Sequence, residues 1–76
     1  MEDEEMSKAE EKARFIISLR STENLVKDFE ATETNNDPDI YIVRGWLMDE
    51  LEARDSKAFE AWIDSYDASP RKYFVA

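Results

Sequence analysis

The sequence predicts an all-α fold, a small bundle of three or four helices. Apolar residues recur at spacings of three and four along most of the chain, which places them on one face of a helix. Residues that cap helices precede these segments, and only one glycine and two prolines are present to interrupt them. The 76 residues fit one domain, and a hydrophobic content of 42% exceeds that of a typical disordered segment.

The N-terminal part of the chain changes from acidic to amphipathic. Residues 1–6 predict a disordered acidic N-terminus, and residues 7–76 predict a single helical domain that ends in a C-terminal tail, 69–76. Ser7 and Glu10 fit a capping box, in which the serine caps the helix and the glutamate lies three residues later. We therefore expect a first helix from about residue 7 to residue 19.

Residues 21–33 allow two interpretations. Ser21 can cap a new helix that carries Leu25, Val26 and Phe29. Alternatively, one helix could cover residues 7–33. A stripe at heptad spacing supports that alternative and comprises Phe15, Leu19, Thr22, Val26 and Phe29. Two helices, or one kinked helix, are favoured because serine and threonine compete there for backbone hydrogen bonds. In both cases we expect Phe15, Ile16, Leu19, Val26 and Phe29 to pack against the rest of the bundle.

A further helix is predicted from about residue 38 to residue 54. Asp37 can cap it, and Pro38 suits the first helical position. Its apolar face comprises Ile40, Val43, Leu47 and Leu51. The β-prone run 40–43 gives an alternative, a short strand that could pair with residues 73–75. The helix is favoured because a two-stranded ribbon is marginal without helices to cover it.

The last predicted helix covers about residues 56–66 and begins after Asp55, which can cap it. Its narrow apolar face comprises Ala58, Phe59, Trp62, Ile63 and Tyr66. Ser69 and Pro70 end this helical region. The tail that follows could either fold back over the bundle or serve as a docking peptide.

Composition excludes most classes of chemistry. Without histidine or cysteine, the usual zinc ligands, the commonest general base and the thiol nucleophile are missing. The carboxylates Asp49, Glu50 and Glu52 are typical of a solvated helix face, and residues 35–39 lack the glycine of a calcium loop. One glycine cannot build a phosphate-binding loop. We therefore expect no enzyme, no metal and no cofactor.

The net charge of −9 sets the expected partners. Such a surface repels nucleic acids and anionic membranes, so we expect no direct nucleic-acid binding and no membrane binding. No apolar run is long enough to span a bilayer, and the acidic N-terminus does not resemble a signal peptide. The absence of cysteine fits a cytoplasmic protein.

Aromatic residues beyond those needed for one apolar stripe per helix favour protein binding, because tryptophan and tyrosine dominate interface hot spots. The candidate interaction residues are Tyr41, Gly45, Trp46, Met48, Tyr73 and Phe74. The leading hypothesis is a small acidic, non-enzymatic protein-interaction module, with self-association as a homodimer as one form of it. The alternative is an acidic decoy that mimics nucleic acid and inhibits a nucleic-acid-binding protein. A third hypothesis, an enzyme that uses Asp49 or Glu52, is the least favoured.

Gly45, the only glycine, lies on the polar side of the helix expected over 38–54. A glycine in a helix costs about 1 kcal/mol relative to alanine. It therefore predicts either a bend or a face that another segment approaches closely.

Residues 44–55, together with 58–62 and 69–71, look similar to short uncharacterised proteins of bacterial phages and mobile elements. This resemblance covers roughly the C-terminal half of the chain. It implies a small phage or plasmid protein and no particular activity.

Overall fold

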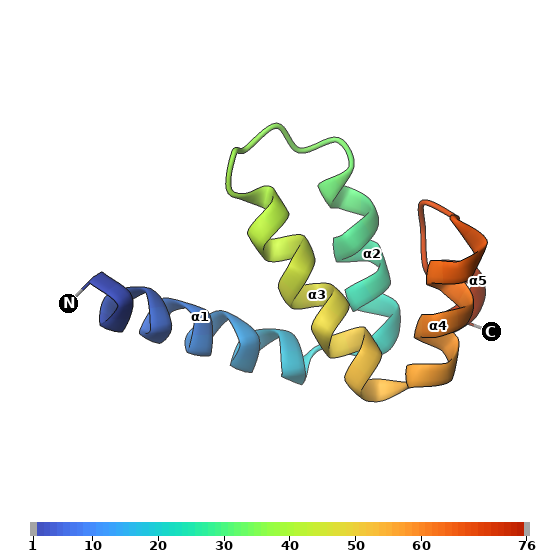
Figure 1. Cartoon of the computed structure of the whole chain (residues 1–76), viewed down its shortest axis with the longest axis horizontal. Coiled ribbons are helices and arrows are strands. Elements are labelled where there is room, and N and C mark those ends of the chain that lie inside the picture. Colours follow the sequence, from blue (N-terminus) through green and yellow to red (C-terminus); the bar gives the residue numbers. More distant parts are fainter. Residues whose placement is uncertain (1, 76) are drawn as a thin grey trace.

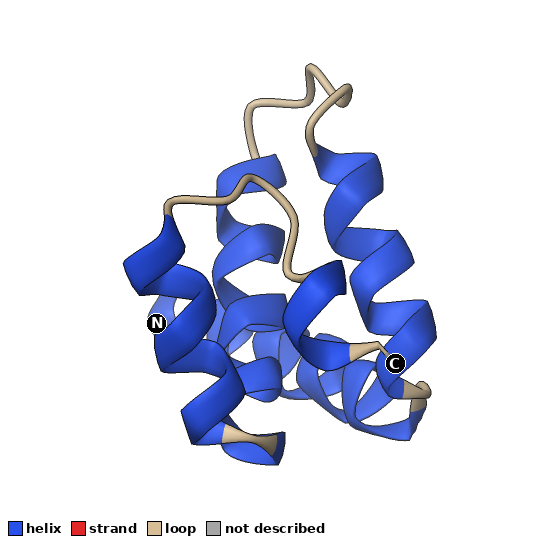
Figure 2. Ribbon diagram, turned by 90° about the vertical axis from the view of Figure 1, so that its right-hand side faces the viewer, coloured by secondary structure: helices blue, strands red, loops and turns tan. Residues whose placement is uncertain are grey.

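The computed structural model describes the backbone of residues 2–75 and the side chains of residues 8–75. Over these residues the chain is a bundle of helices joined by short loops, which confirms the predicted all-α class (Figure 1). No strand occurs in the described part of the chain, as Figure 2 shows, so residues 40–43 are helical and do not pair with the tail.

The first helix, α1 (Glu2–Leu19), begins earlier than the sequence predicts. Residues 2–6 continue the helix where we expected a disordered segment, so Ser7 does not start it. Met1 lies outside the described residues. In Figure 1, α1 extends away from the other helices toward the N-terminus.

The second helix, α2 (Thr22–Thr32), is separate from α1, so the prediction of two helices is confirmed. The Ser21 hydroxyl accepts a hydrogen bond of 3.1 Å from the backbone N–H of Asn24, which caps α2 as expected. Because the chain turns at Ser21, the heptad stripe that runs through Phe15 and Phe29 is not one continuous face.

The third helix, α3 (Ile40–Arg54), is central, because it contacts α1, α2 and α4. It begins two residues later than expected. Asp37 does not cap it, and its carboxylate instead accepts the Asp39 N–H at 2.9 Å within the preceding turn. In Figure 1, α2 and α3 lie side by side as a hairpin, and the C-terminal end of α1 lies beside α3.

The fourth helix, α4 (Ser56–Ser65), is capped by Asp55, whose carboxylate accepts the Ala58 N–H at 3.0 Å as predicted. Tyr66 was expected on its apolar face, but this residue ends the helix in the left-handed conformation with φ of 61° and is exposed. The tail then folds back as a short helix, α5 (Arg71–Phe74), against α2 and α4.

The core lies where α2, α3 and α4 meet, with one contribution from α1. Its buried members are Ile17, Leu25, Phe29, Leu47, Leu51 and Trp62. The ring of Trp62 packs edge-on against Phe29 at 5.1 Å, and the Trp62 indole N–H donates to the backbone carbonyl of Asp67 at 2.8 Å. Such a pairing satisfies the only polar group of a buried tryptophan.

The packing of α1 differs from the prediction, because the residues expected in the core lie on its outer side. Phe15, Ile16 and Leu19 were expected in the core, but their exposed fractions are 63%, 55% and 71%. Ile17, which the apolar spacing did not select, is the residue of α1 that is buried. The helix therefore packs through a different face from the one we expected.

Candidate protein-interaction site

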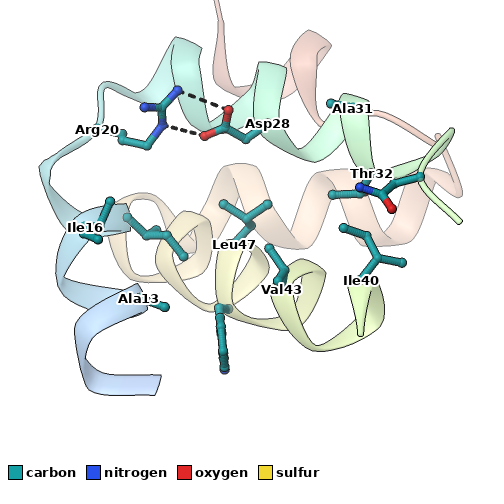
Figure 3. Close-up of a pocket in the computed structure, with 12 residues that line it drawn as sticks. Ala13, Ile16, Arg20, Asp28, Ala31, Thr32, Ile40, Val43 and Leu47 are labelled. Carbon is teal, nitrogen blue, oxygen red and sulfur yellow. Dashed lines mark hydrogen bonds and ion pairs between the residues drawn. The ribbon is translucent and has the colours of Figure 1, made fainter. Parts of the chain in front are cut away.

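A groove of about 510 Å³ lies between α1, α2 and α3 (Figure 3). Figure 3 shows Ile16 and Arg20 at one end of the groove, and Ile40 and Thr32 at the other. Aliphatic side chains form most of its lining. Those contributed by α1 are Ala13, Ile16 and Ile17, and those contributed by α2 and α3 are Ala31, Ile40, Val43 and Leu47, beside Trp46.

The apolar surface continues from the groove onto the outside of α1. Ile16 lines the groove, and Leu19 and Phe15 follow it around the helix. On α3, Ile42 is 42% exposed close to the lining residues Val43 and Trp46. Clustered exposed apolar residues mark interaction surfaces more often than isolated ones do.

Charged side chains at the groove pair with one another. Arg20 donates to the Asp28 carboxylate at 2.5 and 3.1 Å, which closes the groove at the end of Ile16. On the other side of Trp46, Arg14 donates to Glu10 at 2.7 Å and to Asp49 at 3.0 Å. The hydrogen bonds to Glu10 and then Asp49 raise the pKa of Arg14, which stays charged. The Arg14–Asp49 pair joins α1 to α3, and the Arg20–Asp28 pair joins the end of α1 to α2.

The structure places the predicted interaction residues in different parts of the fold. Trp46 is half-buried and lines the groove. Met48 of α3 and Tyr73 and Phe74 of α5 pack against the core instead, and Tyr41 is 75% exposed. Of the six, only Trp46 lies in the groove.

The lone glycine has no visible packing role within the chain. A Cβ added at Gly45 would meet nothing within 4 Å, and its φ is not positive. No close approach by a described segment requires a glycine there, and α3 continues as one helix through this position.

Sequence reasoning missed Phe15, Ile16 and Leu19 as surface residues because it took the apolar residues of α1 as the face that packs inward. The Ser21 cap separated α2 from α1 but did not say which face of α1 is buried. Residues 15–17 are all apolar, so their spacing alone does not distinguish the buried Ile17 from its exposed neighbours.

A second polar cluster attaches the C-terminal tail to α2. Glu30 of α2 accepts hydrogen bonds from Arg71 at 2.7 and 2.9 Å and from the Ser69 hydroxyl at 2.7 Å. The bonds from Arg71, and then the bond from Ser69, lower the pKa of Glu30 to about 2. The tail is thus folded back against the bundle, which is one of the two predicted arrangements, and does not extend as a free docking peptide.

The described residues contain no group of three carboxylates that could hold a metal ion, and no described helix has the length and apolarity to cross a membrane. No known protein family, curated protein or solved structure matches this chain. The apolar lining and paired charges of the groove suit binding of an apolar surface.

Proposed function

We propose that this chain is a non-enzymatic protein-interaction module that binds a partner in the groove between α1, α2 and α3. The observation that carries the proposal is the exposure of Ile16 and Leu19 beside the aliphatic groove lining. Fully burying an aliphatic side chain of this size contributes roughly 1.5–3 kcal/mol, so covering these two residues favours association.

The shape of the groove favours a helix as the bound element. It is open along one side and bounded by helices, and an amphipathic helix can lay its apolar face into such a groove. Residues spaced by three and four on that helix would contact Ile16, Val43 and Trp46. The alternative proposal, an acidic decoy, rests on net charge alone, and it predicts a strong loss of binding at high salt.

The ion pairs within the fold favour binding through the apolar groove over the acidic decoy. Among residues 8–75, six carboxylates form ion pairs with arginine or lysine, and these are Glu10, Glu23, Asp28, Glu30, Asp49 and Glu50. Part of the acidity thus serves internal pairing. Binding in the groove would depend mainly on apolar contact and would persist at high salt. A cytoplasmic setting and a phage or mobile-element origin belong to the same proposal, and repulsion of phosphate by the −9 charge argues against direct nucleic-acid binding.

The test is site-specific photo-crosslinking in the cells that make the protein. A photoreactive amino acid at Leu19, beside the groove, should give covalent adducts with a protein partner. The same group at Lys57, exposed on α4, is the matched control and should give few. Adducts at Leu19 should disappear when Ile16 is changed to Glu. Equal yields at the two positions would overturn the proposal.

A further inference from the structure

We propose that the partner in the groove is a basic amphipathic helix of another protein. Its apolar stripe lies in the groove, and lysine or arginine residues flank that stripe. This inference rests on the proposed function and names the chemistry of the partner. It follows from the apolar lining of the groove and from the charges that surround it.

The lining of the groove favours an apolar stripe over a charged one. Arg20 is the basic residue among those that line it, and Asp28 is the acidic one. These two side chains pair with each other, so their charges compensate within the chain. The other lining residues are apolar, apart from Thr32 and Asn35. A partner therefore gains most by covering this surface with apolar side chains.

The loop between α2 and α3, at one end of the groove, is acidic. Asn35 of this loop lines the groove together with Thr32 and Ile40, which lie away from Ile16 (Figure 3). Residues 33–39 contain three carboxylates and no lysine or arginine. All three acidic residues are exposed, and none forms an ion pair among residues 8–75: Glu33, Asp37 and Asp39. Carboxylates without a partner in the chain attract positive charge to this end of the groove.

The first half of α1 adds further negative charge beside the groove. Residues 2–12, which precede the lining residue Ala13, contain six carboxylates and two lysines. In Figure 1 this part of α1 extends beyond the helices that form the groove. A basic partner is thus attracted by α1 as well as by the loop. A second copy of this chain carries the same net charge of −9 and would be repelled.

The apolar and the charged contacts have separate roles in this binding. The apolar stripe supplies most of the affinity, because an exposed ion pair contributes little. The loop carboxylates decide which amphipathic helix binds, since an acidic helix would place like charges against them. Salt screens such exposed charges over about 8 Å at physiological ionic strength and about 3 Å at 1 M. Binding should therefore weaken about three- to tenfold in 1 M salt and should not be lost.

Three model peptides of about five helical turns test the inference with the purified full chain. The first carries leucines at spacings of three and four, flanked by lysines. The second replaces the lysines with glutamates, and the third keeps the composition of the first but scatters its leucines around the helix. Isothermal titration calorimetry should show that the first binds at least about tenfold more tightly than either of the others. Equal binding of the second would overturn the basic partner, and equal binding of the third would overturn the apolar stripe. Complete loss of binding in 1 M salt would likewise overturn the stripe.

Charge reversal in the loop tests whether its carboxylates meet the partner. A Glu33→Lys, Asp39→Lys double variant should bind the first peptide about three- to tenfold more weakly than the unmodified chain. The control is Glu60→Lys, Asp64→Lys, which changes the net charge equally at exposed positions of α4 and should weaken binding less. Circular dichroism checks that each variant remains helical. If the loop variant does not fold, Glu33→Gln, Asp39→Asn is compared with Glu60→Gln, Asp64→Asn instead. Equal weakening by the loop pair and the α4 pair would show that net charge alone attracts the peptide, and would overturn the role of the loop.

A neutral substitution in the groove tests the apolar contact. Ile16→Gln should weaken binding of the first peptide at least about tenfold, because it places an amide in an apolar contact and leaves the charge unchanged. Ile63→Gln, at a partly exposed apolar residue of α4, is the matched control and should leave binding nearly unchanged. If Ile63→Gln weakens binding as much as Ile16→Gln, the peptide does not bind in this groove.

Failure of this inference is distinguishable from failure of the proposed function. If the first peptide binds no better than the other two, the basic amphipathic helix is the wrong partner. Adducts with a protein at Leu19, lost on Ile16→Glu, would then still support the interaction module. Absence of both peptide binding and adducts would overturn both proposals.

Discussion

The guanidinium of Arg54 donates a hydrogen bond of 2.7 Å to the backbone carbonyl of Arg20, just past the end of α1. The same nitrogen contacts the carbonyl of Ser18 at 3.2 Å, and the other terminal nitrogen donates to the Thr22 hydroxyl at 3.1 Å. Because the last carbonyls of a helix lack partners within the helix, this arginine completes the C-terminus of α1. One side chain of α3 therefore fixes the turn that sets the direction of α1.

Replacement of Arg54 with Met should lower the free energy of unfolding by about 1.5–3 kcal/mol, the range for hydrogen bonds to charged groups. The methionine keeps part of the aliphatic stem, so the loss reports on the hydrogen bonds. Urea denaturation followed by circular dichroism measures it. Lys57→Met, on the exposed side of α4, is the control and should change stability little. Equal effects of the two substitutions would contradict the role of Arg54.

Two neighbouring residues of α1 test which face of the helix packs inward. Ile17 is 8% exposed and Ile16 is 55% exposed, although both are isoleucines in the same turn. Ile17→Ala should destabilise the chain by about 2–4 kcal/mol, and Ile16→Ala by no more than about 0.5 kcal/mol at a concentration where the chain is monomeric. The reverse order in urea denaturation would show that α1 packs through the face that its apolar spacing predicts.

Substitution of Gly45 with Ala should raise stability by about 1 kcal/mol, because alanine is the better helix former and the added methyl group meets no atom within 4 Å. Thermal unfolding at low protein concentration measures this gain. If the substitution instead impairs adduct formation at Leu19, a partner approaches α3 at this glycine.

The attachment of the tail should depend on pH through Glu30. Its pKa is lowered from 4.5 to about 2 by the hydrogen bonds from Arg71 and Ser69, so the folded state favours the ionised carboxylate. This stabilisation is fully present above pH 4.5 and is lost as the pH falls toward 2. The midpoint of thermal unfolding of the unmodified chain should therefore exceed that of Glu30→Gln at neutral pH. The two midpoints should converge as the pH is lowered, and a constant difference would contradict the assignment.

Local signals predicted much of the fold. The caps at Ser21 and Asp55 were readable because a capping side chain bonds to a backbone N–H only three residues away. The helix over residues 40–54 followed from the spacing of Val43, Leu47 and Leu51. Each of these signals operates within a turn or two of helix.

The orientation of α1 and the place of the tail depend on contacts that are distant in the sequence. Arg54 reaches the end of α1 across 34 positions, and Arg71 reaches Glu30 across 41. Such pairs cannot be read from spacing along the chain. The groove was missed for the same reason, because three helices build it and its position depends on the face that α1 presents. Trp46 was the one candidate interaction residue that the structure places there.

The most direct test of the account is photo-crosslinking from three positions of the chain in the cells that make it. The account predicts adducts with a protein partner from photoreactive groups at Leu19 and Ile42, which are exposed beside the groove, and few from Lys57 on α4. Yields at Lys57 as high as those at Leu19 and Ile42, or no adducts at any of the three positions, would contradict the claim that this groove binds a partner.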